Sequence, residues 1–262
     1  MVKFYKIDTE TKLQDYQDAC FEVFRNLVRF LDENQIEYWL DGGSILGLIR
    51  HEDFIPWDDD IDIAMDVNNY QKFRKLALNG LPYELSFIDE GNIYMKKGFC
   101  KVLNSKYEMV NHVDESIYCI YGAYVDIFLM VDYPTLPSQF TKPVLNLVGR
   151  FMGNLGAARY KVSTKNIMKM IMYLVFGGVI NCIWRLLPKS NKISNPFGLN
   201  VYNILHDKSN IFPIKKLKWR DVDVSIPNNS DGYIKELYGS NYMQIPPLDK
   251  QVTHSVKVLK NG

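Results

Sequence analysis

Four carboxylates stand within five positions of this chain, at Asp58, Asp59, Asp60 and Asp62. Like charges this close repel one another and oppose ionisation, so their grouping costs stability unless a cation lies among them. Carboxylate oxygens suit Mg²⁺, with Mn²⁺ as an alternative, and Mg²⁺ usually completes its coordination with water and substrate phosphates. The cluster therefore predicts a divalent metal site and a substrate that carries phosphate.

A period-two pattern places two of these carboxylates on one side of a strand. In the sequence Asp-Ile-Asp-Ile that begins at Asp60, acidic and apolar residues alternate. Asp60 and Asp62 therefore share one face, while the isoleucines enter the core. We predict Asp60 and Asp62 as metal ligands, and Asp58 and Asp59 as residues that fix the loop or orient metal-bound water.

A glycine turn lies upstream of the acidic run. Residues 38–40 are aromatic and apolar, Gly42 and Gly43 form a turn signal, and Ser44 stands where a helix would begin. The start of a helix offers free backbone N–H groups and the positive end of the helix dipole, where an anion can bind. Gly43 and Ser44 are therefore predicted to bind a substrate phosphate.

Two basic residues are further candidates for phosphate binding. Arg50 follows the turn, and its guanidinium suits a pair of phosphate oxygens. An ion pair with Asp58 or Asp59 is the alternative for Arg50. Lys101 lies in a strand expected over residues 94–104, where its ammonium could neutralise donor phosphate or point into solvent.

These motifs and others downstream resemble the LicD family of phosphocholine and polyol-phosphate transferases, which includes the fukutin-type proteins. The resemblance extends over nearly the whole chain, in the expected order. Gly43-Ser44 stands where many members carry Gly-Thr, and Lys250-Gln251 where an arginine is commoner. The residues that carry the resemblance are Asp41-Gly42 through Leu46-Gly47, Arg50-His51, Phe54 to Asp62, Tyr124-Val125-Asp126-Ile127-Phe128, Tyr238 to Met243, Pro246-Pro247 and His254.

The resemblance implies a nucleotidyltransferase fold and an enzyme that takes a substituted phosphate from a CDP-linked alcohol. The acceptor would be a hydroxyl of a saccharide or lipid-linked glycan, as in capsule, teichoic acid or lipopolysaccharide, and CMP would be released. Asp126 would join the metal ligands or act as general base, and His254 would approach the substrate. Two alternatives stay open: a nucleotidyltransferase that releases pyrophosphate, and a non-catalytic, membrane-associated glycan assembly factor.

The expected architecture is α+β, with a mixed sheet flanked by helices. Apolar residues recur at three- and four-residue steps from Leu13 to Phe30, which predicts one long amphipathic helix. A single domain would comprise a core over about 10–133, a helical insertion over about 138–192 and a completing C-terminal segment over about 195–262. Within it we expect a helix capped by Asn68 or Asn69, strands over 83–88, 94–104, 118–130 and 219–226, and a helix over 231–237.

The helical insertion contains a run without charge, from Ile171 to Trp184. It is shorter than the roughly 20 apolar residues needed to span a bilayer. Residues 167–187 could be buried in a helical lobe, could lie at a membrane interface together with the basic residues around them, or could span the membrane.

The composition of the chain favours a globular protein and argues against binding of nucleic acid. The chain has 262 residues, of which 47% are hydrophobic, so it can bury one substantial core. Its 31 basic and 30 acidic residues give no field that would attract nucleic acid. The four cysteines are scattered without zinc-like spacing, which predicts reduced core residues. No signal peptide is apparent at the N-terminus, so we expect action in the cytoplasm, with contact to the inner face of the cell membrane as an option.

Overall fold

The computed structural model describes most of the core and only part of the middle of the chain. His254, predicted to approach the substrate, lies outside the described residues. The described residues are 13–89, 99–104, 123–135, 186–195 and 204–251, together with helical positions 167, 168, 171, 172, 175 and 179.

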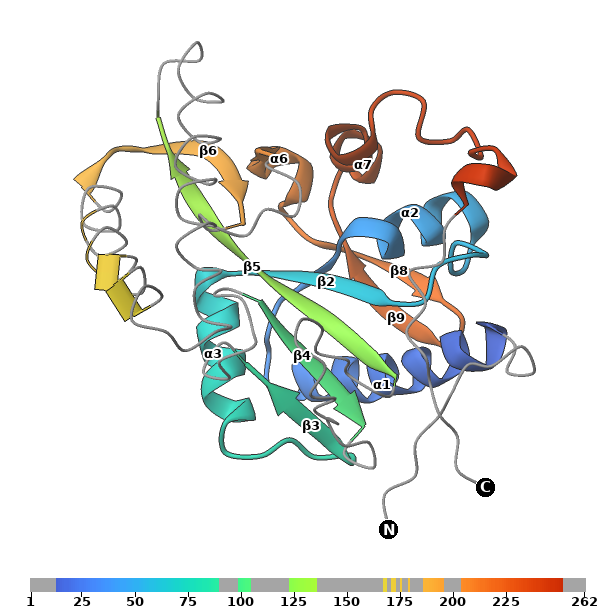
Figure 1. The fold of residues 1–262 in the computed structure, drawn as a ribbon, viewed down its shortest axis with the longest axis horizontal. Coiled ribbons are helices and arrows are strands. Elements are labelled where there is room, and N and C mark those ends of the chain that lie inside the picture. Colours follow the sequence, from blue (N-terminus) through green and yellow to red (C-terminus); the bar gives the residue numbers. More distant parts are fainter. Residues whose placement is uncertain are drawn as a thin grey trace.

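A mixed β-sheet forms the centre of the molecule (Figure 1). Its strands run in the spatial order β1-β2-β5-β4-β3. β2 and β5 are parallel, and the other neighbouring pairs in this path are antiparallel. The expected α+β class is thereby confirmed. The strand bounds are β1 (Trp39–Leu40), β2 (Ile61–Asp66), β3 (Leu85–Ile88), β4 (Phe99–Asn104) and β5 (Tyr124–Pro134).

β5 continues beyond the central sheet and pairs there with a later segment. β6 (Lys189–Ser194) is antiparallel to the end of β5, and β7 (His206–Asp207) pairs in turn with β6. The first residues of β6 were expected at the end of the helical insertion. They form a strand because the far end of β5 offers an unpaired edge, which no pattern in their own sequence reveals.

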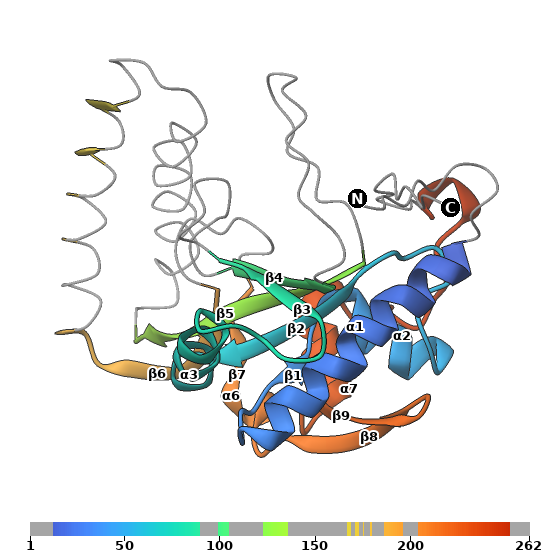
Figure 2. The same ribbon diagram turned by 90° about the horizontal axis from the view of Figure 1, so that it is seen from below.

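The long N-terminal helix is confirmed as α1 (Leu13–Glu33). Its apolar side packs on the sheet, and Phe21 and Phe24 also meet the buried Trp219, with ring centroids 5.3 and 5.6 Å away. Figure 2 shows α1 and the strands β8 and β9 on the same side of the sheet. Aromatic packing therefore joins the N-terminal helix to the C-terminal part of the chain.

Trp219 belongs to a hairpin where one strand was expected. β8 (Lys215–Trp219) and β9 (Val222–Ile226) are antiparallel. Arg220 turns the chain between them in a left-handed conformation, with φ 52°. The strand predicted over 219–226 is confirmed from Val222 onward as β9, but its first residues belong to the end of β8 and to the turn, which no glycine marks.

The remaining helices begin at side-chain caps. α2 (Gly42–His51) starts two residues before Ser44, because the Asp41 carboxylate accepts a hydrogen bond from the Gly42 N–H. α3 (Val67–Ala77) is capped by Asp66 rather than by Asn68 or Asn69. The C-terminal segment supplies α6 (Lys208–Ile211), α7 (Ser230–Tyr238), close to the expected 231–237, and a 3₁₀ turn (Leu248–Lys250).

Two other expectations are tested in part. Cys20 and Cys100 are buried free thiols, as predicted, and the other two cysteines lie outside the described residues. Within the described ranges, no helix has the length and apolar character needed to cross a bilayer. Most of residues 167–187, for which three arrangements were considered, lie outside those ranges.

Replacing Trp219 by alanine should remove 3–5 kcal/mol, to order of magnitude, from the free energy of unfolding. The side chain is fully buried, and its Nε1 donates to Asp53 Oδ1 at 2.8 Å. Urea denaturation monitored by circular dichroism measures the change. Leu217→Ala, on the same strand but 38% exposed, is the matched control and should cost less than about 1 kcal/mol. Equal losses in the two variants would contradict this account of the core.

Candidate active site

Three neighbouring strands place charged residues in one row across the sheet. The register of the parallel pair sets Asp62 on β2 beside Asp126 on β5, and the antiparallel pair sets Lys101 on β4 on the other side of Asp126. Residues paired in this way point to the same face of a sheet. Asp126 is thus held between another carboxylate and an ammonium group.

The structure brings the three predicted catalytic aspartates together. Asp60, Asp62 and Asp126 each present a carboxylate oxygen within 4.8 Å of those of the other two. Asp62 and Asp126 expose only 9% and 7% of their surface. Asp58 and Asp59 form a second group of the same kind with Asp60. Hard oxygen donors converging from two strands and a loop are a donor set that Mg²⁺ or Mn²⁺ accepts.

The cluster resists full ionisation. Burial, followed by the charges of Asp60 and Asp126, holds the pKa of Asp62 well above its usual value. Burial and the neighbouring Asp60 and Asp59 raise the pKa of Asp58 to about 7. Burial also raises the pKa of Asp126 to about 6, although Lys101 acts in the opposite direction. A divalent cation would remove this repulsion, so the electrostatics of the residues fit a metal site.

The glycine turn lies directly against the carboxylates. A Cβ on Gly42, whose φ is +51°, would come within 2.4 Å of Asp62 Oδ2, and a Cβ on Gly43 within 2.2 Å of Asp58 Oδ2. Both positions favour glycine because the carboxylates of Asp62 and Asp58 lie where a Cβ would be. Gly43 is therefore next to the acidic cluster, as its predicted role in phosphate binding requires.

Ser44 has a structural contact that the sequence did not predict. Its Oγ accepts a hydrogen bond of 2.8 Å from the Asp62 N–H, and the residue is 4% exposed. The hydroxyl thus fixes the start of β2 to α2 and can still donate its own hydrogen. Ser44 therefore orients Asp62. Because Ser44 is buried, a ligand could reach its Oγ only by entering the glycine turn.

Lys101 is not the solvated lysine that was one of its two predicted environments. Its side chain is 12% exposed, and its ammonium forms an ion pair with Asp126. The ammonium also lies 3.6 Å from the centre of the Tyr124 ring, a cation–π distance. Lys101 is therefore part of the cluster, close to where a phosphate bound there would lie.

Arg50 is anchored to the C-terminal segment. Its guanidinium donates to the Tyr242 carbonyl at 2.8 Å and to His51 Nε2 at 2.9 Å. Among the described residues it makes no ion pair with Asp58 or Asp59, the alternative considered from the sequence. Arg50 connects α2 to the segment after α7, and the structure does not bring it into the carboxylate cluster.

Helix α1 is hydrogen-bonded to the loop that contains Asp58. Gln17 Nε2 donates to the carbonyls of Asp58, at 2.8 Å, and Ile55, at 3.2 Å. Gln17 is 4% exposed, so these bonds lie in the interior. No local pattern predicts this role, because Gln17 lies 41 positions from Asp58 and belongs to no motif.

A tyrosine of α7 supports the glycine turn. Tyr233 Oη donates to Asp41 Oδ1 at 2.6 Å and accepts from Trp39 Nε1 at 3.1 Å. Its ring stacks on His206, with 4.2 Å between centroids. Asp41 is therefore fixed by a residue 192 positions away, and sequence reasoning did not identify Tyr233.

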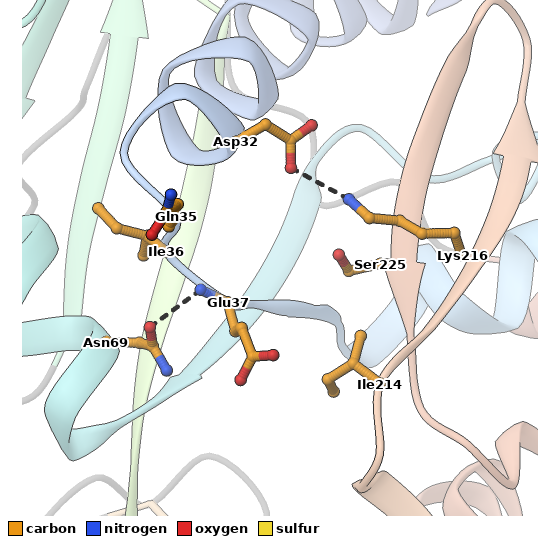
Figure 3. Close-up of a pocket in the computed structure, with 8 residues that line it drawn as sticks. All are labelled: Asp32, Gln35, Ile36, Glu37, Asn69, Ile214, Lys216 and Ser225. Carbon is orange, nitrogen blue, oxygen red and sulfur yellow. Dashed lines mark hydrogen bonds and ion pairs between the residues drawn. The ribbon is translucent and has the colours of Figure 1, made fainter.

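A cavity of about 420 Å³ lies elsewhere, between the end of α1 and the β8–β9 hairpin. Figure 3 shows its residues, among which Lys216 is already paired with Asp32 at 3.1 Å. None of the clustered aspartates lines it. The carboxylate row, and not this cavity, is therefore the candidate active site.

Without divalent metal, replacing Asp58 by asparagine should stabilise the protein increasingly as pH rises. The pKa of Asp58 is about 7 in the folded state and about 3.9 in an unfolded chain. Between these values the folded state holds a proton that the unfolded state has released, so raising the pH favours unfolding. Asp58→Asn has no carboxyl group at this position, so its stability does not fall with pH for this reason. Urea denaturation in EDTA at about pH 5 and about pH 8 measures the difference.

Asp223→Asn is the control for this comparison, because Asp223 is exposed on the hairpin with 71% of its side chain accessible. Its stability relative to the unmodified chain should not change between the two pH values. If Asp58→Asn behaves in the same way as this control, the proposed repulsion is absent.

Tyr233→Phe should lower the free energy of unfolding by about 1–3 kcal/mol, because it leaves the buried Asp41 carboxylate and Trp39 N–H without their common partner. Thermal and urea denaturation measure the loss. Tyr238→Phe, on the same helix and 40% exposed, is the control, with an expected change within about 0.5 kcal/mol. A neutral Tyr233→Phe would show that the hydrogen bonds to Asp41 and Trp39 contribute nothing.

Comparison with known proteins was made for the whole chain. The family described as LicD/FKTN/FKRP, nucleotidyltransferase domain, matches residues 35–143. The lipopolysaccharide cholinephosphotransferase LicD of Haemophilus influenzae is 41% identical over 61 residues, which are 23% of this chain and 23% of that protein. Human ribitol 5-phosphate transferase FKRP is 33% identical over 106 residues, or 39% of this chain and 20% of that protein. Mannosyltransferase regulator 4 of Saccharomyces cerevisiae is 30% identical over 70 residues, or 26% of this chain and 6% of that protein.

The aligned segments cover at most 23% of the length of these three relatives. The matched range contains β1 to β5, and with them the glycine turn and the clustered aspartates. The resemblance noted for residues 238–254 lies outside it. Residues 35–143 of this chain are thus similar to the LicD family.

Proposed function

We propose that this chain is a divalent-metal-dependent phosphotransferase. It would move a substituted phosphate, phosphocholine or polyol phosphate, from a CDP-linked alcohol to a hydroxyl of a cell-surface glycan precursor. The observation that carries the proposal is the convergence of Asp60, Asp62 and Asp126 within 4.8 Å of one another. Three carboxylates at this separation, two of them nearly buried, destabilise a fold by their repulsion, whereas a phosphate-transferring site needs them to hold a cation.

In this proposal, the aspartates would bind the metal ion and Lys101 would interact with the donor phosphate. Asp60 and Asp62 would hold the cation, and Asp126 would share it or take the proton of the attacking hydroxyl. The positive charge of a Mg²⁺ ion held there would stabilise the negative charge of the donor phosphates. Lys101 forms an ion pair with Asp126. Its positive charge would act together with that of the cation on the donor phosphate.

The proposed transfer is a substitution at the phosphorus atom that carries the alcohol. The acceptor oxygen forms a bond to the phosphorus that carries the alcohol, and the bond from that phosphorus to the CMP oxygen breaks. The hydroxyl proton goes to Asp126 or to solvent, and CMP leaves with the electron pair of the broken bond. Backbone N–H groups at the Gly43 turn would bind the phosphates, and Ser44 would keep Asp62 in place through its 2.8 Å hydrogen bond.

The relatives support this class of reaction by name, since one is a cholinephosphotransferase and another a ribitol 5-phosphate transferase. The matched family is itself described as a nucleotidyltransferase domain, which favours the release of pyrophosphate from CTP as the second candidate. The yeast relative is named a regulator, so a non-catalytic role in glycan assembly is the third.

Nucleotide products discriminate among these functions. The protein is incubated with Mg²⁺ and CDP-choline, CDP-ribitol, CDP-glycerol or CTP, with candidate glycan acceptors, and the products are separated by chromatography. We expect CMP from one of the CDP-alcohols. Pyrophosphate from CTP would favour the second candidate, and no turnover with any donor would favour the third.

Asp62→Asn should reduce CMP formation at least about 100-fold, because it removes one charge from the proposed cation site. It should also weaken Mn²⁺ binding measured by electron paramagnetic resonance. Asp223→Asn is the matched control, since Asp221 and Asp223 repeat the Asp-x-Asp spacing of Asp60 and Asp62 on the exposed hairpin. Undiminished turnover by Asp62→Asn would exclude the carboxylate cluster as the catalytic site.

A further inference from the structure

The ion pair between Lys101 and Asp126 belongs to the row of charged residues across the sheet. The strand register sets Asp62, Asp126 and Lys101 side by side, on the strands β2, β5 and β4 (Figure 1). On the other side of Lys101 the row ends at Ile88 of β3, which carries no charge. Asp126 therefore has carboxylates on one side and a positive charge on the other.

Apolar side chains shield this ion pair from water. Leu103 and Tyr124 are paired on the same two strands, two residues away from Lys101 and Asp126, so all four side chains lie on one face of the sheet. Leu103 is 2% exposed and Tyr124 is 8% exposed. Opposite charges attract strongly where little water screens them. Lys101 should therefore leave Asp126 only when another cation takes its place.

A divalent cation in the cluster would bind the same carboxylate. Asp126 presents an oxygen within 4.8 Å of oxygens of Asp60 and Asp62. A metal ion and an ammonium on one carboxylate would lie close together and repel each other. The metal ion carries twice the charge of the ammonium and attracts three carboxylates instead of one. The two cations therefore compete for Asp126, and the metal ion is the stronger competitor.

We propose that Lys101 is the counter-ion of Asp126 when no metal is bound, and that a divalent cation displaces it. This inference rests on the metal site of the proposed function. Lys101 would lower the affinity of the site for metal, and its displaced ammonium would then be available to the donor phosphate. A phosphate that holds the ammonium would remove the competition, so substrate and metal would each strengthen the binding of the other.

Lys101→Met should bind Mn²⁺ at least about tenfold more tightly than the unmodified chain, because the metal no longer has to displace an ammonium. Electron paramagnetic resonance measures the free Mn²⁺ without nucleotide, at about pH 8, where protons compete less for the carboxylates. Lys208→Met is the matched control, because Lys208 pairs at 2.7 Å with Asp132, also on β5 but outside the cluster. Its Mn²⁺ affinity should not change. Unchanged or weaker binding by Lys101→Met would overturn the proposal.

A double-mutant cycle shows whether Lys101 acts through Asp126. Asp126→Asn should weaken Mn²⁺ binding, because it removes a ligand charge. In that background Lys101→Met should change the Mn²⁺ affinity by less than about twofold, because metal and ammonium no longer share a carboxylate. An equal gain in both backgrounds would mean that the ammonium repels the metal from a distance, and it would overturn the displacement.

Amine labelling tests the displacement in the unmodified chain, so it holds even if Lys101→Met fails to fold. The protein is treated with an amine-acetylating ester with and without saturating Mg²⁺, and mass spectrometry measures the labelling rate of each lysine. Lys101, 12% exposed when paired, should be labelled at least about threefold faster with Mg²⁺. Lys208, whose side chain is 27% exposed, should be labelled equally in both conditions. Equal labelling of Lys101 would show that its ion pair persists with metal bound.

Mn²⁺ binding also separates failure of this inference from failure of the proposed function. If neither the unmodified chain nor Lys101→Met binds Mn²⁺, the metal site is absent, and both proposals are wrong. If Mn²⁺ binds and Asp62→Asn weakens it, while Lys101→Met leaves the affinity unchanged, the proposed function stands and only the displacement is wrong. CMP formation does not serve as the readout, because Lys101 is also proposed to interact with the donor phosphate.

Discussion

Repulsion between Asp62 and Asp126 is the constraint around which this structure is arranged. β2 and β5 are parallel and pair these two residues directly, at the roughly 4.8 Å spacing of neighbouring strands. Neither carboxylate can move into bulk water without breaking the strand ladder, and Asp60 adds a third charge nearby. Burial, together with the charge of Asp60, raises the pKa of Asp126 to about 6 and holds the pKa of Asp62 well above its usual value, to which Asp126 also contributes. Lys101 on the next strand offsets only part of it.

The rest of the fold holds the cluster from several directions. Ser44 bonds to the backbone of Asp62, Tyr233 to the carboxylate of Asp41, and Gln17 to the carbonyl of Asp58. These supports come from α2, α7 and α1, and all are buried or nearly so. Buried polar groups of this kind are costly unless each has its partner. The site is therefore stable only within the complete fold, and the C-terminal segment is as necessary to it as the acidic strand.

The clustered carboxylates lower the stability of the protein when no metal is bound. A loss of stability of this kind is characteristic of functional sites. The matched family range ends at residue 143, so the turn and the carboxylates lie inside it while Tyr233 and its helix lie outside. The matched segment thus contains the clustered carboxylates, and the support for its glycine turn comes from later residues.

The sequence by itself determined the features that depend on near neighbours. The three- and four-residue steps from Leu13 predicted α1, and the alternation at Asp60 placed two carboxylates on one face, because such periods follow from local backbone geometry. The crowding of aspartates and the glycine turn indicated the site for the same reason, and the motif around Asp126 was recognised only by its resemblance to a family.

Only the tertiary structure decided which distant residues meet. Nothing near Lys101 specifies its pairing with Asp126, and nothing near Arg50 specifies its hydrogen bond to the Tyr242 carbonyl. The β8–β9 hairpin and β6 likewise formed where the sequence predicted a single strand and a helix. Strand register and long-range hydrogen bonds arise when segments far apart in the chain pack together, and a pattern read over a few residues contains no information about that packing.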